Sequence, residues 1–403
     1  MFFRHKEEFL NDSIHTVLNN YNGISDSLTI IIPAGYTSPE YAAGKNIVLT
    51  SIPTAIKKIT IQGDGTSPTL LVKQINPPLV SLKSFYLKNL TLKGIEDGAS
   101  SLTLSNSLLF MAKDTLETIS IEGCNIANFS GVVGKATFSK IGNININNCI
   151  ARGLGASGLI STTSGTIGNI VVRNSTVYGA SGNLISNSIA PLSITVSDCT
   201  FDQICNTSKY FISAITGVVN LMVLKNIVFG RTLSLSSFGV RVTAKDSVYT
   251  NCYVSMDWMN SGYLIPNRNY YYTSSYNLFK SPTSYNLTTN VATVGDYTII
   301  DGNFPGAINA GDPRWYYNGN INSVDENFDT GKMKVYPSLV KELLNVEYDG
   351  TCNYQIVDMN GRVWKTGIVM FKNGINTSSL PQGMYIINLQ KEHSAKAFKF
   401  NKI

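Results

Sequence analysis

One short pattern recurs along most of this 403-residue chain and constrains its fold more than any other feature. Each copy is an alternating apolar strand followed by Asn, Asp or Gly and then by a small or apolar residue, as in Ile119–Ile126 and Ile144–Ala151. A period of about two dozen residues in strand-type units is typical of a solenoid. Successive copies lie 24 to 34 residues apart when they are aligned on the residue after the Asn, Asp or Gly, namely Leu90, Cys124, Cys149, Ser175, Cys199, Ile227 and Cys252.

The alternation within each copy predicts a strand with one buried face. Ile119 and Ile121 share one side of the strand, whereas Ser120 and Glu122 share the other. The Asn or Asp that follows favours a sharp bend, because these side chains tolerate left-handed backbone. A strand, a bend and a second strand make one coil of a parallel β-helix, in which each strand pairs with its copies in neighbouring coils. The preference for right-handed crossovers predicts a right-handed coil.

Four of the six cysteines share the inward position of the repeat, and the pattern predicts that they stack inside the solenoid. We expect reduced, buried thiols, because free cysteine behaves as a small hydrophobic residue; disulfides between neighbouring coils are the alternative. The chain has no C-x-x-C pair, and its three histidines lie outside the repeats, so no zinc site is expected. The predicted interior column is Cys124, Cys149, Ser175, Cys199 and Cys252.

Charge and hydropathy exclude two classes of partner. The net charge is +6, but residues 331–403 carry +5 of it, so the solenoid is close to neutral and no basic patch predicts nucleic-acid binding. The sequence contains no run of 18 apolar residues, so it predicts no transmembrane helix. Residues 1–8 are too polar and acidic for a secretory signal peptide, which indicates either a cytoplasmic protein or a signal that lies upstream or has been removed. We expect a monomer.

The remaining segments predict two domains. Residues 6–20 have apolar side chains at helical spacing and are expected to form a helix that caps the solenoid within a domain over residues 1–320. Residues 255–320 lose the repeat and are rich in tyrosine, which indicates an irregular C-terminal cap or, alternatively, aromatic platforms for sugars. Residues 321–332 form a polar linker. The short alternating strands of residues 333–403 predict a small Ig-like β-sandwich, which makes the whole chain all-β.

Two resemblances support this division. The cap helix, a strand that ends in Pro33-Ala-Gly-Tyr36 and the Ile59-Thr-Ile-Gln-Gly63 strand resemble the entry of pectate-lyase-like right-handed β-helices. Residues 310–316 look like the close of β-helix domains of unknown function. Residues 333–403 resemble the C-terminal sorting domain of the type IX secretion system, although Tyr336-Pro-Ser-Leu339 replaces the usual Tyr-Pro-Asn-Pro. This second resemblance implies export to the cell surface or beyond, with the sorting domain as the address read by the secretion machinery and often cleaved.

The outward positions of adjacent coils form two rows of candidate binding residues. One row, before the bend, is Glu122, Asn147, Arg173, Ser197 and Lys225; the other, beyond it, is Ala127, Arg152, Tyr178, Asp202 and Gly230. Polysaccharide binding is the function that we predict for these rows, and solvated surface charge is the alternative. The five residues expected to contact substrate are Arg152, Arg173, Tyr178, Asp202 and Lys225.

The sequence assigns no catalytic residue. Hydrolases of the resembling class have clustered aspartates and a Gly-His-Gly, neither of which occurs here, and the coils contain no histidine. Lyases of that class hold Ca²⁺ with carboxylates and use Arg or Lys as the base, but only Asp202, and less directly Glu122 and Asp198, is placed to bind a cation. We therefore expect no cofactor, with Ca²⁺ only under the lyase hypothesis. The hypotheses are a surface polysaccharide-binding protein, a divergent polysaccharide lyase and a structural or adhesive spacer.

Overall fold

The computed structural model divides the chain into two compact units, Met1–Asn318 and Gly319–Ile403, and each is considered by itself. The predicted cap helix and the predicted linker both lie outside the residues that the structure describes. These residues are 26–37, 47–49, 55–65, 67–77, 82–94, 106–112, 115–137, 140–283, 285–286, 291–317, 334–347, 351–358, 362–370, 374–391 and 394–403.

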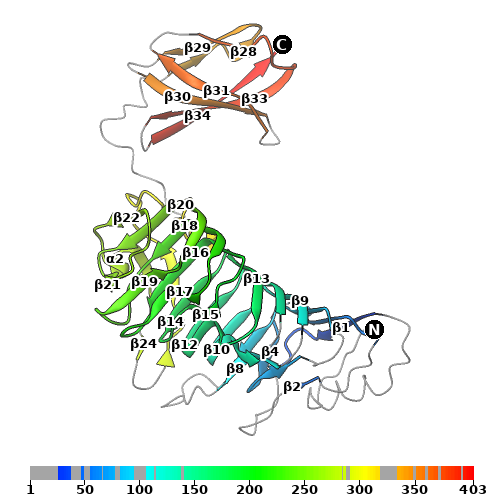
Figure 1. Cartoon of the computed structure of the whole chain (residues 1–403). Helices are drawn as coiled ribbons and strands as arrows, with labels where there is room; N and C mark the ends of the chain where they lie inside the picture. Colours follow the sequence, from blue (N-terminus) through cyan, green and yellow to red (C-terminus); the bar gives the residue numbers. More distant parts are fainter. Residues whose placement is uncertain are drawn as a thin grey trace. The chain divides into compact units, whose positions relative to one another are not determined.

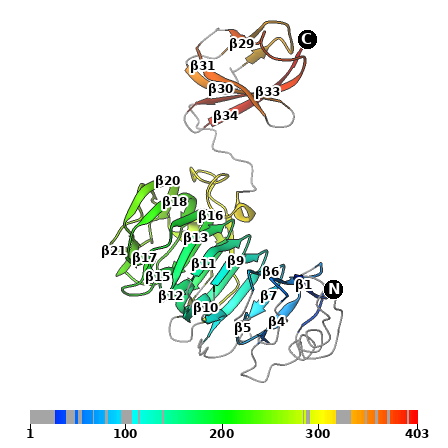
Figure 2. The same ribbon diagram turned by 45° about the vertical axis from the view of Figure 1, so that its right-hand side comes forward.

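The first unit is a parallel β-solenoid, as predicted, and its coils stack from the blue to the green end of the ribbon (Figures 1 and 2). The pairing of strands between coils gives three faces, which we name A, B and C in chain order. The hand of the coil stays a prediction. Face A contains β1 (Ser27–Ile32), β3 (Lys58–Gly63), β6 (Ser84–Lys88), β9 (Thr115–Glu122), β11 (Lys140–Asn147), β13 (Thr166–Arg173) and the first parts of β16 (Ser193–Ile204), β18 (Val219–Phe229) and β20 (Ala244–Ser255).

Faces B and C complete each coil. Several strands are long enough to continue around a bend from one face to the next. Face B contains β4 (Thr69–Leu71), β7 (Thr91–Lys93), the first parts of β10 (Asn125–Thr137) and β12 (Ile150–Thr162), β14 (Thr176–Ala180), the later parts of β16, β18 and β20, and β22 (Arg268–Tyr271). Face C contains β2 (Ile47–Val48), β5 (Ile75–Asn76), β8 (Ser107–Ala112), the later parts of β10 and β12, β15 (Ile185–Ile189), β17 (Tyr210–Thr216), β19 (Ser237–Arg241) and β21 (Asn260–Gly262).

Left-handed residues make both bends that bound face B. At the first bend, the amide of Asn251 donates to Asn226, and that of Asn226 donates to Asp198, so the bend side chains also connect neighbouring coils. The predicted role of the recurring Asn or Asp is thereby confirmed. Positive φ angles occur at Asn89, Gly123, Asn148, Asn174, Asp198, Asn226 and Asn251 in the first bend, and at Asn128, Gly153, Gly179 and Gln203 in the second.

The predicted interior column is confirmed. All five residues of the column are at most 1 % exposed, and its four cysteines are free thiols. Each thiol donates to the carbonyl two residues earlier, as from Cys199 to Ser197 at 3.0 Å. Burial raises the pKa of Cys199, and it raises that of Cys252 to about 12.

Native protein treated with a thiol reagent is therefore expected to lose few of these four thiols. The reason is that all four sulfur atoms are enclosed, and that burial also keeps Cys199 and Cys252 protonated, whereas the thiolate is the reactive form. Counting modified residues by mass spectrometry, with and without denaturant, checks this, and the denatured chain serves as the fully reactive control. Rapid modification of all four cysteines in the native state would contradict the buried column.

The described residues among 279–317, namely 279–283, 285–286 and 291–317, follow the last coil and contact face B; we name them the return segment. The chain passes from β22 through the short helix α2 (Ser275–Leu278) into β23 (Phe279–Ser281), β24 (Tyr285–Asn286), β25 (Val291–Ala292), β26 (Asp296–Ile299) and the 3-10 helix η1 (Pro313–Trp315). A second apolar core lies beneath it, formed by Tyr178 and Val228 of face B and by Phe279, Tyr297 and Phe304 of the return segment, among others.

The second unit consists of two sheets around one core. The core includes Val346 of the smaller sheet and Ile356 and Ile387 of the larger one. The smaller sheet is β27 (Lys334–Tyr336), β29 (Leu343–Glu347) and β32 (Gly374–Asn376), and the larger is β28 (Leu339–Val340), β34 (Ser394–Lys402), β33 (Gly383–Lys391), β30 (Thr351–Asp358) and β31 (Val363–Met370).

Candidate functional site

The structure places the five predicted binding residues in two rows, in the predicted register. Arg152 pairs with Tyr178, and Tyr178 pairs with Asp202, on face B. These three side chains are 8 %, 1 % and 0 % exposed, because the return segment covers them. Arg173 and Lys225 lie on face A and are exposed. The expected open surface at Arg152, Tyr178 and Asp202 is therefore absent, and substrate contact by the five residues stays a prediction.

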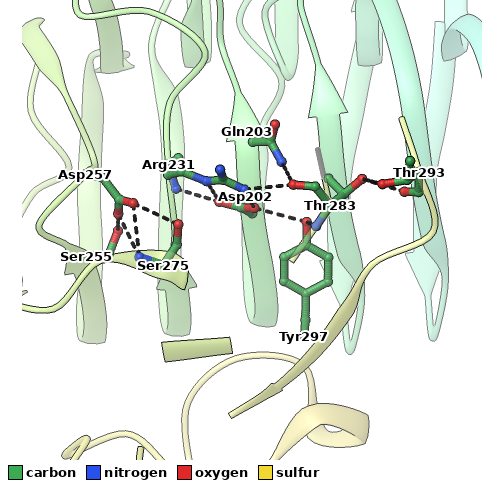
Figure 3. Close-up of polar contacts among 9 residues, drawn as sticks. All are labelled: Asp202, Gln203, Arg231, Ser255, Asp257, Ser275, Thr283, Thr293 and Tyr297. Atoms are coloured by element: carbon green, nitrogen blue, oxygen red, sulfur yellow. Dashed lines mark hydrogen bonds and ion pairs between the residues drawn. The ribbon is translucent and has the colours of Figure 1, made fainter. Parts of the chain in front are cut away.

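Asp202 is the centre of a buried polar network (Figure 3). Its carboxylate accepts from the guanidinium of Arg231 at 3.0 Å and from the backbone N–H of Arg231 at 2.7 Å. The hydroxyl of Tyr297 donates to the same carboxylate at 3.1 Å. Burial and the adjacent negative charge of Asp202 raise the pKa of Tyr297 well above its usual value, so this tyrosine stays neutral and donates.

The same network holds the start of the return segment (Figure 3). The carbonyl of Thr283 accepts from Arg231 at 2.9 Å and also from the amide of Gln203. Nearby, the carboxylate of Asp257 accepts from the backbone N–H of Ser275 at 3.0 Å and from its hydroxyl at 2.9 Å, which fixes the first turn of α2. These contacts identify the network as a structural anchor.

A second anchor lies at the end of the return segment. Asp312 accepts from the hydroxyl of Thr176 at 2.7 Å, and its backbone N–H donates to Thr200 at 3.0 Å. Burial raises the pKa of Asp312, while Arg314, whose Nε lies 2.9 Å from the carboxylate, opposes this shift. The indole N–H of Trp315 donates to Thr176 at 2.6 Å. Two successive coils are thus tied to one short stretch of chain.

The middle of the return segment contacts the other two buried residues of the predicted set, Arg152 and Tyr178. Arg152 donates to the carbonyl of Ala292 at 2.9 Å, and the backbone N–H of Gly295 donates to the hydroxyl of Tyr178 at 3.3 Å. Arg152, Tyr178 and Asp202 therefore each make a polar contact with a different point of the return segment or its anchor. These polar side chains are buried because the return segment lies over them and pairs with their polar groups.

A cavity of about 300 Å³ lies between face B and Val294, Gly295 and Trp315 of the return segment. The solenoid supplies one wall and the return segment supplies the other. Two cationic side chains, Lys93 and Arg152, line it together with the indole of Trp315, and the lining includes no carboxylate among the described residues. The full lining is Thr91, Lys93, Asn125, Ile126, Ala127, Ile150, Arg152, Tyr178, Val294, Gly295 and Trp315.

The lining of this cavity combines polar side chains with an aromatic ring. Ligand sites typically combine apolar walls with a few polar groups that fix orientation. Here the polar side chains are those of Thr91, Lys93, Asn125 and Arg152, and the apolar wall includes Trp315. The guanidinium of Arg152 already donates to the carbonyl of Ala292. Lys93 and Arg152 contribute two positively charged groups to this lining.

Sequence reasoning missed Lys93 and Trp315, for different reasons. Lys93 pairs with Ala127, which pairs with Arg152, so it belongs to the predicted outer row one coil further toward the N-terminus. Extending that row to the copy at Leu90 would have found it. Trp315 lies in the return segment, outside the repeat, where the sequence carries no register signal.

The described residues include neither a metal-binding cluster nor a membrane-spanning helix. In this part of the chain no group of three or more His, Cys, Asp or Glu side chains is placed to hold a metal ion. None of its helices is both long enough and apolar enough to span a membrane.

Comparison with protein families gives two matches. Residues 43–180 match a domain of unknown function, DUF4957, and residues 334–402 match the secretion system C-terminal sorting domain. No curated protein and no solved structure gave a significant match. The sorting domain indicates export through the type IX secretion system, so the protein is secreted or lies at the cell surface. The chain thus combines a DUF4957 domain, within its parallel β-solenoid, with a secretion system C-terminal sorting domain.

Proposed function

We propose that the solenoid binds polysaccharide outside the cell, and that the cavity between Lys93 and Trp315 is the binding site. The observation that carries this proposal is the cavity itself: about 300 Å³, lined by two cations, an amide and an indole. The export signal of the second unit supports it, because an exported protein meets glycans of the cell surface and its surroundings.

The ligand class that fits best is an acidic polysaccharide. Hydrogen bonds between an ammonium or guanidinium and a carboxylate or sulfate are stronger than those between neutral groups. Face A offers a competing surface, since Arg173 and Lys225 are exposed there, two coils apart in one row. Variants on face A and variants in the cavity lining therefore distinguish binding at face A from binding in the cavity.

Replacing Lys93 by alanine is expected to weaken binding of an acidic glycan about tenfold or more, because a hydrogen bond to a charged group contributes roughly 1.5–3 kcal/mol. Isothermal titration with polygalacturonate, alginate, chondroitin sulfate and neutral dextran measures this. Lys245→Ala is the matched control, because it removes an exposed lysine of the same solenoid outside both predicted rows.

Different outcomes identify different functions. Loss of affinity in Lys225→Ala or Arg173→Ala, with Lys93→Ala unchanged, would assign binding to face A and overturn the cavity. Equal affinity for dextran would overturn the preference for acidic ligands. Ultraviolet absorbance of an unsaturated product during the titration would identify the protein as a lyase. No heat with any of the four glycans would count against polysaccharide binding.

A further inference from the structure

Three aromatic side chains form a row on the outer side of face C, on the neighbouring strands β17 and β19 and directly after β21 (Figure 1). Tyr210 pairs with Phe238, and Phe238 pairs with Gly262, which precedes Tyr263. Phe211 is fully buried in the core, so its neighbour Tyr210 points outward. The rings of Tyr210 and Phe238 are stacked with their centroids 4.8 Å apart, and Tyr263 packs edge-on against both. Tyr210 and Phe238 are half-buried and Tyr263 is 53 % exposed, so the row is fixed by its own packing and remains accessible.

The guanidinium of Arg241 lies over this row and is held there by uncharged groups. Its central carbon is 4.3 Å from the centroid of the Tyr210 ring, and it donates to the Tyr210 hydroxyl at 3.2 Å and to Ser213 at 2.9 Å. Arg231, by contrast, pairs with the carboxylate of Asp202. Among the described residues no carboxylate pairs with Arg241, and a guanidinium has further N–H donors beyond the two used here. A positive charge with free donors therefore lies beside accessible rings.

The sequence around this row is basic. The stretches 205–218 and 230–243, which contain β17 and β19, are described throughout and contain Lys209, Arg231 and Arg241 but no Asp or Glu. The neighbouring face C strands β15 and β21 also contain no acidic residue. Because Arg231 is already paired with a carboxylate, Lys209 and Arg241 remain as the cations of this surface. Complementary charge favours the binding of an anionic partner.

Hydroxyl groups lie beside the arginine, in the coils that precede it. Ser161, Ser186 and Ser213 occupy the position of Arg241 in three successive coils of face C. Stacking between coils explains the aromatic rings by themselves, because packed rings stabilise neighbouring strands. It does not explain why a cation and a row of hydroxyls accompany them. An apolar platform with a few polar groups beside it is the usual composition of a small-ligand site.

We propose that the surface formed by Tyr210, Ser213, Phe238, Arg241 and Tyr263, which we name the Arg241 site, binds an acidic sugar residue of a polysaccharide. The guanidinium of Arg241 binds the carboxylate or sulfate of the sugar, since such charge-assisted hydrogen bonds are strong. The exposed ring of Tyr263 packs against the apolar face of the sugar ring. The Arg241 site shares its class of ligand with the cavity but lies on another face, so it can bind whether or not the cavity does.

Calorimetric titration of the full chain with polygalacturonate, alginate and chondroitin sulfate measures this binding, in a Lys93→Ala background that weakens the cavity. In this background Arg241→Gln is expected to lower the affinity about tenfold or more, because hydrogen bonds to a charged group are lost. Arg268→Gln is the matched control and should leave the affinity unchanged. Arg268 also lies over a tyrosine ring, 4.7 Å from the centroid of Tyr270, but on face B. Tyr263→Ser keeps Arg241 and its contacts and should weaken the same ligands, so it decides the test if Arg241→Gln fails to fold.

The outcomes separate the Arg241 site from the cavity. If Arg241→Gln and Tyr263→Ser both bind as tightly as their background, the Arg241 site is overturned, whereas a loss of affinity on Lys93→Ala alone supports the cavity. If Arg241→Gln lowers the affinity and Lys93→Ala does not, the cavity is overturned and the Arg241 site stands. Equal affinity for neutral dextran would overturn the acidic class of ligand, and equal affinity for poly-L-glutamate would overturn the assignment to a sugar. No binding of any of the three acidic glycans would overturn both sites.

Discussion

Replacing Asp202 by alanine is expected to lower the free energy of unfolding of the solenoid by about 3–5 kcal/mol, because removing one partner of a buried ion pair leaves the other charge uncompensated. Asp202 is fully buried, and its carboxylate accepts from Arg231 and Tyr297. Denaturant titration of the full chain measures the change. Hydrogen exchange of residues 291–317 should accelerate as well, because the return segment loses its anchor.

An exposed ion pair of the same solenoid supplies the matched control. Lys83 and Glu117 are bridged at 3.0 Å, but both side chains are more than half exposed. Glu117→Ala is expected to cost at most about 1 kcal/mol. If Asp202→Ala cost no more than this control, the buried network would not be an anchor. The pair Asp202→Leu with Arg231→Met should recover part of the loss, because it removes both charges together.

Deleting residues 334–403 is expected to abolish delivery to the cell surface and to leave the solenoid folded. The deleted residues form a separate unit with its own core and match the sorting domain, whereas the solenoid keeps all its coils. Expression in a host with type IX secretion, with a signal peptide supplied upstream, tests this. Surface protease accessibility and periplasmic fractionation report where the truncated protein accumulates.

The reciprocal fusion completes the export experiment. Residues 319–403 attached to an exported reporter should direct that reporter to the surface, while Lys225→Ala in the full chain should not change its location. A truncated solenoid that still reached the surface would show that the address lies elsewhere. A truncated solenoid that failed to fold would show that the two units depend on one another.

The repeating part of the fold could be predicted because its determinants are local and recur. Each coil has its own alternation, its own bend residue and its own inward side chain. A copy that departs from the pattern can therefore still be aligned by comparison with the others. The left-handed φ values of Asn148, Asn174 and Asp198 follow from side chains that tolerate this conformation. The register of Cys199 with Ile227, and of Ile227 with Cys252, follows directly.

The environment of the site could not be predicted in the same way. The sequence assigned Arg152, Tyr178 and Asp202 to outward positions, and that orientation is correct with respect to the coils. Their burial depends on the return segment, which has no repeat and contacts the solenoid across long stretches of sequence, 95 positions between Asp202 and Tyr297 and 140 between Arg152 and Ala292. Such contacts depend on tertiary packing, which no periodicity in this segment signals. The cavity could not be predicted for the same reason, because one of its two walls is the return segment.

The return segment also constrains how this solenoid can evolve. Coils of a solenoid contact only their neighbours, so a lineage can usually gain or lose one at small cost. Here Ala292 is matched to Arg152, and Tyr297 is matched to Asp202, two coils further along. An extra coil between β12 and β16 would displace one of these contacts by about 4.8 Å. Relatives of this protein should therefore differ in coil number before β10 and keep it constant beneath the return segment. The matched contacts of that segment fix the number of coils that it covers.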